Sequence, residues 1–346
     1  MRKVIFLLFI FFLLAVPVSA IELEAPQVPQ SGQDLMPYDT ESFAEGAWSI
    51  ISSAISRLRP DLADALRTGA GLVGICVLLS SVKLIPGTQE RITELVGIVS
   101  VALSLLGTSG SMIRLAVETV TELSAYGKLL FPVLTASLAA QGGSATSAAL
   151  YAGTLAFDAI LGALVSSLII PMVYILLCLS VLSAATGQEL IVKLRDLCKW
   201  LMTWSMKIVL YVFTGYMGIT GVVSGTTDAA ALKATKLAIS GMVPVVGGIL
   251  SDTSEAVLVG AGVVKSAIGV YGMLSVLAVW ISPFLRIGTH YILLKSAYGL
   301  SVIFPTKQTG GLIKDFSGVM GLLLAMTGMV CLFLMVSVVC FMKGVA

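Results

Sequence analysis

The sequence predicts an all-α, polytopic integral membrane protein: a bundle of long apolar helices with an internal duplication and hairpins broken by Pro and Gly. Three observations predict this fold class. Of the 346 residues, 57% are hydrophobic and only 12% are charged, whereas soluble domains carry roughly 25% charge. The mean hydropathy is +1.01. Two pairs of prolines also recur at one offset of 112 residues, Pro132 with Pro244 and Pro171 with Pro283, and such self-similarity favours a duplicated unit.

The chain begins with a pattern typical of a secretory signal peptide, residues 1–20. Two basic residues precede an apolar run, and Val18-Ser19-Ala20 offers small side chains for cleavage; a retained anchor helix is the alternative. Residues 21–68 would then form a short acidic extracytoplasmic segment, because its eight acids outnumber three arginines. We expect residues 21–40, rich in Pro and Gln, to be loose and residues 41–67 to be helical.

The rest of the chain is predicted to lie almost continuously in the membrane. Residues 69–110 contain two apolar stretches long enough to cross it, joined by a polar turn that includes Lys83 and Glu94. Lys83 is expected to extend its ammonium group to the lipid headgroups. Membrane repeat unit 1 would comprise residues 111–225, and repeat unit 2 would comprise residues 226–346.

Each unit is expected to contain a short hairpin, at residues 129–143 and 241–250, and long helices interrupted at a proline. A basic linker follows in each unit, at residues 188–206 and 305–317. The excess of Lys and Arg places both linkers in the cytoplasm, which requires an even number of crossings per unit and favours parallel repeats. The alternative is inverted repeats with re-entrant hairpins, as in many secondary transporters.

The two hairpins supply most of the candidate functional residues. Pro132 and Pro244 each lack a backbone N–H and restrict the preceding residue, so each is expected to break its helix within the membrane. Gly247 and Gly248 would allow close approach of the backbone. Asp252 would cap the helix that leaves the second hairpin, with ion binding as the alternative. We therefore predict that the two hairpins form the centre of a pathway or the contact surface for another subunit.

Three ionisable residues lie within apolar helices, where such groups usually face a bundle interior or a water path. Asp158 is a candidate pathway or subunit-contact residue, and a hydrogen-bonded structural aspartate is the alternative. Arg286 and His290 lie one turn apart beside Pro283. They predict either the lining of a polar cavity or an interfacial helix face.

The sequence offers no candidate catalytic, cofactor-binding or metal-ligating residue. It has one histidine and five widely spaced cysteines, a composition that argues against metal cages and His-based triads. It also lacks the glycine-rich loop of phosphate-binding ATPases. A net charge of +2 gives no electrostatic case for nucleic acid. We therefore expect a non-enzymatic protein without a cofactor, whose partners include the lipid bilayer.

The segment 226–272 carries a family resemblance. Its run AxKATKLAISGMVPVVGGILSDTSEAV, continued to Gly269, resembles the stage III sporulation protein AE family of endospore-forming bacteria, with Lys236, Pro244, Gly247 and Asp252 at matching positions. The signal peptide, acidic segment and polytopic body fit that family over nearly the whole chain. The resemblance implies a subunit of a secretion-like transenvelope channel complex between mother cell and forespore.

The resemblance also implies the partners and the place of action. These would be other membrane subunits, a secretion-type ATPase and ring-forming subunits, in the mother-cell membrane around the forespore. Two further function classes stay open. One is a self-contained secondary transporter, or permease, with repeat-related gating hairpins, and the other is a scaffold that only anchors partners.

Overall fold

The computed structural model describes residues 25–37, 42–87, 89–140, 144–219 and 267–343. All regular elements in these ranges are helices, so the predicted all-α class is confirmed. In chain order they are α2 (Gln30–Gln33), α3 (Phe43–Arg57), α4 (Arg59–Lys83), α5 (Glu90–Ala140), α6 (Ser144–Leu164), the π-helical η1 (Val165–Ile169), α7 (Ile170–Thr186), α8 (Glu189–Ile219), α11 (Ala267–Ser301) and α12 (Lys307–Lys343).

Five stretches of the described residues are long and apolar enough to cross a membrane. They are Arg59–Lys83, Glu90–Leu138, Ser147–Thr186, Ile268–Ser301 and Lys307–Met342. The protein is therefore a helical membrane protein. At about 1.5 Å per residue, the 51 residues of α5 extend over about 76 Å, which is more than twice the ~30 Å of a hydrocarbon core.

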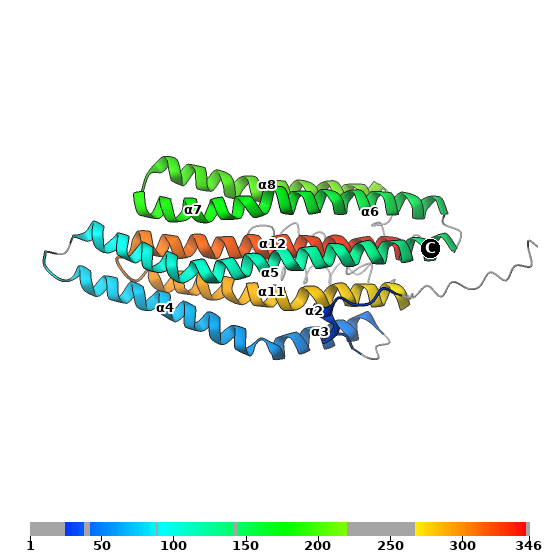
Figure 1. Ribbon diagram of the computed structural model, residues 1–346, viewed down its shortest axis with the longest axis horizontal. Coiled ribbons are helices and arrows are strands. Elements are labelled where there is room, and N and C mark those ends of the chain that lie inside the picture. Colours follow the sequence, from blue (N-terminus) through cyan, green and yellow to red (C-terminus); the bar gives the residue numbers. More distant parts are fainter. Residues whose placement is uncertain (1–24, 38–41, 88, 141–143, 220–266, 344–346) are drawn as a thin grey trace, which may run out of the picture.

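The long helices lie side by side along one axis (Figure 1). Helices α5, α11 and α12 form the middle of the bundle, α4 covers one side, and the α7–α8 pair covers the other. The α4–α5, α7–α8 and α11–α12 connections all lie at the same end. We call this end, with residues 84–87, 187–188 and 302–306, the turn end.

The arrangement at the turn end bears on the predicted repeats. The α7–α8 and α11–α12 hairpins run in the same direction, and α8 ends where α11 begins, at the opposite end of the bundle. The two basic linkers, residues 188–206 and 305–317, therefore lie at one end, as parallel repeats require. The duplication itself and the cytoplasmic location of the linkers stay predictions.

Helix α12 forms the core of the bundle. It contains the most apolar of the five stretches, and 94% of its most apolar window is buried by other helices. Phe316, Phe333 and Phe341 are almost completely buried. Close approach to α12 depends on small residues: a Cβ at Gly127 of α5 would lie 2.7 Å from Leu334, and one at Gly269 of α11 would lie 2.5 Å from Met342 Sδ. The strongest hydrophobic segment thus packs against protein rather than lipid.

The first proline-broken hairpin is a wrong prediction. Helix α5 runs without interruption through Pro132 to Ala140, so the chain stays helical over most of residues 129–143. Neighbouring helices allow a membrane helix to keep a proline, and here Leu130, Phe131 and Leu134 beside Pro132 are buried in the bundle. The expected division between residues 110 and 111 also lies inside α5.

Pro171 and Pro283 do not separate helices either. Pro283 lies inside α11. Pro171 follows the π-helical turn η1, and the chain remains helical from α6 through α7. A π-type turn re-spaces the backbone hydrogen bonds locally, which accommodates the missing N–H of Pro171 without a break.

The segment before the first span is partly ordered against the bundle. Helix α2 lies on α11, where a Cβ at Gly32 would be 3.0 Å from Val279. Leu35 is buried, so the expectation of a loose segment is wrong for residues 25–37. The helix expected at residues 41–67 is confirmed as α3 and the start of α4. The predicted signal peptide lies outside the described residues.

Candidate functional site

A buried carboxylate at the turn end joins α5 to α12. Glu94 is 7% exposed, and its Oε1 accepts hydrogen bonds from the backbone N–H groups of Gln308 and Thr309, both at 3.1 Å. Thr309 Oγ1 donates to the same oxygen at 3.2 Å. The first N–H groups of a helix have no partner within it, and its dipole favours a negative charge there. Glu94 therefore caps α12 from a neighbouring helix.

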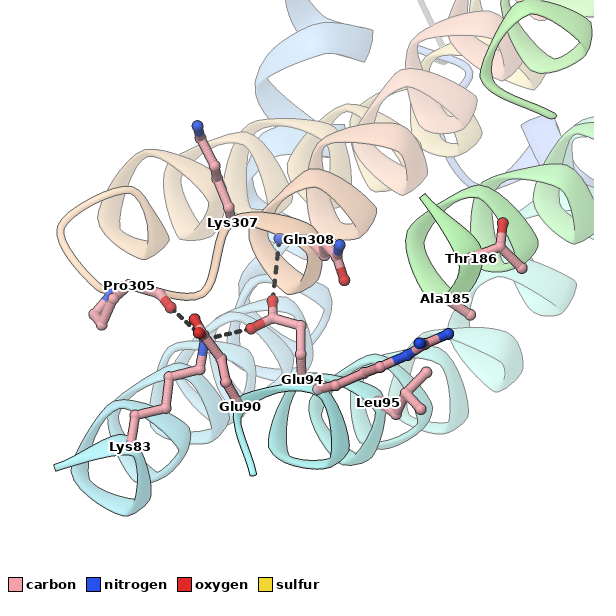
Figure 2. Close-up of a pocket in the computed structure, with 10 residues that line it drawn as sticks. Lys83, Glu90, Glu94, Leu95, Ala185, Thr186, Pro305, Lys307 and Gln308 are labelled. Atoms are coloured by element: carbon pink, nitrogen blue, oxygen red, sulfur yellow. Dashed lines mark hydrogen bonds and ion pairs between the residues drawn. The ribbon is translucent and has the colours of Figure 1, made fainter. Parts of the chain in front are cut away.

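The Lys83 ammonium group completes this network. Its Nζ donates to Glu94 Oε2 at 2.5 Å and to the Pro305 carbonyl at 2.6 Å, and Glu90 lies 3.5 Å away. Figure 2 shows Glu94 between Lys83 and Gln308. The Lys83 side chain is only 11% exposed, so its predicted extension to the headgroups is wrong. A buried ammonium group requires a charged partner, and Glu94 supplies one.

A polar cleft of about 450 Å³ opens beside the network. Figure 2 draws its lining, which comes from α4, α5, α7, the α11–α12 turn and the start of α12: Lys83, Glu90, Arg91, Glu94, Leu95, Ala185, Thr186, Pro305, Lys307 and Gln308. Arg91 and Lys307 are exposed, and within the described part of the chain neither forms an ion pair. The cleft offers two unneutralised cations to a polar or acidic group.

A second ion pair fastens α8 to α12. Arg195 Nη1 donates to Asp315 Oδ2 at 2.7 Å and lies 3.5 Å from Ser183 Oγ of α7. Asp196, the next residue, accepts from Arg195 Nε and Nη2 at 3.0 and 2.9 Å. Burial alone would lower the pKa of Arg195, but Asp196 and Asp315 outweigh it, and the pKa is raised. The guanidinium group thus stays charged and holds the two basic linkers together.

Comparison with known families identifies the chain. The stage III sporulation protein AE family matches residues 72–344. The chain belongs to the stage III sporulation protein AE family. Stage III sporulation protein AE of Bacillus subtilis (strain 168) is 22% identical over 206 residues, 60% of this chain and 49% of the relative. The chain thus spans about half the length of that relative. No solved structure matches it.

The family match covers the whole turn end. It begins within α4 and includes Lys83, Glu94, Arg195 and Asp315. The sequence indicated a polar turn and two basic linkers, but it did not single out these four residues as a site. The available signal for Glu94 is an acid at the fifth position of an apolar helix, one turn after Glu90. Its partners on α12 lie more than two hundred positions away, so the pairing required the structure.

Asp158 packs between α6 and α5, away from the turn-end cleft. Ser124 Oγ donates to both carboxylate oxygens, at 2.9 and 3.0 Å, and Lys128 Nζ lies 3.6 Å from Oδ2. The carboxylate is buried, and these contacts satisfy it. This geometry favours the structural alternative, in which Asp158 joins two helices, and a pathway role stays a prediction.

Arg286 and His290 make separate polar contacts in the described structure. Arg286 Nε lies 3.0 Å from Asp61 Oδ1 and links α11 to α4. His290 is buried, and its Nδ1 lies 3.0 Å from the Arg286 carbonyl of its own helix. Neither residue lines the turn-end cleft, nor does Pro132. Five other candidates lie outside the described residues: Lys236, Pro244, Gly247, Gly248 and Asp252.

Proposed function

We propose that this chain is a non-enzymatic membrane subunit of the secretion-like channel complex that joins mother cell and forespore. The observation that carries the proposal is the family match over residues 72–344, which includes nearly the whole helical bundle. The sequence contains no phosphate-binding loop, so a partner such as a secretion-type ATPase would supply the energy for transport.

The turn end is the proposed face toward the mother-cell cytoplasm. Lys and Arg are concentrated there, at positions 83, 91, 193, 195, 199, 307 and 314, and positive residues near span ends favour the cytoplasmic side. Helix α3, expected outside the cytoplasm, lies toward the opposite end. The cleft with Arg91 and Lys307 would then receive an acidic group of the ATPase or of another cytoplasmic subunit.

The continuous α5 favours a subunit over a self-contained transporter. A gate built from two repeat-related hairpins needs a break at Pro132 as well as at Pro244, and α5 has no break at Pro132. Gly127 and Gly269 let α5 and α11 approach α12 closely. Packing inside the bundle therefore accounts for these small residues without a gate. Energy from a partner is therefore the simpler account of transport.

A test of the complex uses the sporulating source organism. The chain is replaced by wild type, by Arg91→Glu/Lys307→Glu, or by the control Lys193→Glu, whose lysine is exposed and pairs with Glu189 outside the cleft. We expect wild type and control to co-purify with the ATPase and to support spore formation, and the double variant to lose both at unchanged abundance. Full spore yield without the protein would contradict the function; normal yield from the double variant would remove only the docking role.

A test of orientation uses two cysteines in a cysteine-free background. Position 198 lies in one basic linker and position 308 in the other. We expect an impermeant thiol reagent to label neither site in intact cells and both in inverted vesicles. Labelling of just one site in either preparation would exclude the common cytoplasmic face.

A further inference from the structure

We propose that a cleft between α8, α11 and α12 binds the phosphate group of an anionic lipid. Its volume is about 160 Å³, well above the ~10–15 Å³ that one water requires. Lys199, Lys295 and Lys314 line it together with Tyr291 and Tyr298, and the lining contains no acid. It is separate from the turn-end cleft beside Glu94.

The three lysines leave their charge available. Lys295 Nζ donates to the Tyr291 hydroxyl at 3.0 Å, and Lys314 Nζ lies 5.7 Å from the Tyr298 ring centre. None of the three has an ion-pair partner within 4.0 Å among the described residues. The nearby Asp315 pairs with Arg195 at 2.7 Å, and the charge of Lys199 acts on it only from beyond ion-pair distance. Three cations and two hydroxyl groups around one space form a site for a phosphate oxygen cluster.

Helix α12 is shaped to admit the Lys199 ammonium group. A Cβ at Gly318 would lie 3.1 Å from Lys199 Nζ, so the ammonium rests on bare helix backbone. Gly321, one turn further, also lines the cleft. The two glycines keep the space between α8 and α12 open at this level.

The surroundings favour a lipid over a soluble phosphate. Trp200 and Trp204 lie beside Lys199 on the outer face of α8, exposed and stacked at 5.6 Å, and exposed tryptophan is typical of the headgroup level. Leu197, Leu201 and Ile292 present apolar side chains nearby, where acyl chains would lie. Basic pockets between helices on the cytoplasmic side suit anionic headgroups.

The experiment measures lipid retention by the full chain. The protein is placed in nanodiscs of phosphatidylcholine with 20% phosphatidylglycerol, which gives the bilayer a negative surface charge roughly like that of a cytoplasmic leaflet. It is then released in the mass spectrometer, and its bound lipids are counted. We expect wild type to keep phosphatidylglycerol over phosphatidylcholine. Lys199→Gln/Lys295→Gln/Lys314→Gln should reduce that retention about tenfold, whereas the charge-matched control Arg91→Gln/Lys193→Gln/Lys307→Gln should keep it.

Further arms decide the source of the phosphate and guard against misfolding. Inorganic phosphate at millimolar concentration should not raise the thermal stability of wild type; if it does so while phosphatidylglycerol does not, the cleft binds soluble phosphate and the lipid proposal is overturned. The single variant Lys295→Gln changes an exposed side chain and should fold, with a partial loss of retention. If the folded single and triple variants retain as much phosphatidylglycerol as wild type, the proposed site is overturned. It is also overturned if the control variant loses as much phosphatidylglycerol as the triple variant.

Discussion

Helices α8 and α12 both leave the turn end after a short turn, yet the first turns of α8 expose their leucines while α12 points its apolar side chains inward. Helix α12 buries almost all of its apolar residues inside the bundle. Helix α8 exposes Leu190, Leu194, Leu197 and Leu201 and turns Arg195 inward toward Asp315. Helix α12 therefore serves as the core, and the first half of α8 covers it on the outside of the bundle.

The stretch Ser147–Thr186 is almost as apolar as the α12 stretch, yet only 44% of its most apolar window is buried, against 94% for α12. Hydropathy alone therefore does not tell an outer helix from a core helix. Lipid tails and a protein interior are both apolar, so association between membrane helices depends on packing and on polar contacts. At their first turns the two helices differ in the same way. Glu94 of α5 holds the start of α12 in a buried network, whereas Glu189 at the start of α8 is exposed.

The largest effect should come from Glu94. In Glu94→Ala the Lys83 ammonium stays buried without its carboxylate, and the Gln308 and Thr309 N–H groups lose their acceptor. Breaking a buried pair costs about 3–5 kcal/mol; because Glu90 and the Pro305 carbonyl remain near Lys83, the free energy of unfolding should fall by an amount near the lower end of that range. Glu189→Ala removes an exposed pair with Lys193, which is worth about 0.3–0.5 kcal/mol.

Native cysteines report this unfolding. Cys76 and Cys331 are buried, so a thiol-reactive dye labels them only on unfolding; Cys178 and Cys198 are replaced by serine to lower the background. Detergent-solubilised variants are heated with the dye, and the midpoints are compared. Equal midpoints for Glu94→Ala and Glu189→Ala would show that α12 is not anchored by the network.

The next largest effect should come from Phe333, in a comparison of a buried apolar side chain of α12 with an exposed one of α8. Phe333 of α12 is 1% exposed and packs on the Phe213 ring of α8 at 4.7 Å between centres. Phe333→Ala should lower the free energy of unfolding by about 3–5 kcal/mol, because it leaves a cavity. Leu197→Ala on the outer face of α8 should change it by no more than about 0.5 kcal/mol.

The same thiol assay measures both variants. Phe333→Leu, which keeps most of the side-chain volume, should fall between them. A loss for Leu197→Ala as large as that for Phe333→Ala would mean that the outer face of α8 is covered by another helix or subunit in the folded protein.

The sequence predicted the helical membrane class because composition alone excludes a water-facing surface. It also predicted that the two basic linkers lie on one side, since their lysines and arginines share a pattern. It failed at Pro132, because the local rule for proline ignores the neighbouring helices that pack on α5 at this level. It missed Glu94 and Lys83, since the value of a charge in a turn depends on a partner elsewhere in the chain.

The smallest effect should come from the ion pair that fastens α8. Arg195→Gln removes a charged hydrogen bond to Asp315, and such bonds contribute about 1.5–3 kcal/mol. Because Lys199 remains near Asp315, we expect a loss at the lower end of that range. In a background that keeps Cys198 and replaces only Cys178, local detachment of α8 should also raise the labelling rate of Cys198, while the buried Cys331 of α12 stays protected below the midpoint. Asp196→Asn is the matched control: Asp196 bonds the same guanidinium, but it lies on α8 itself, so its loss cannot detach the helix. In a double-mutant cycle, Arg195→Gln with Asp315→Asn should destabilise less than the sum of the two single changes, because each single change strands the charge of its partner and the double variant strands neither. Additive losses, or unchanged Cys198 labelling in Arg195→Gln, would show that packing rather than this pair holds α8 on the core.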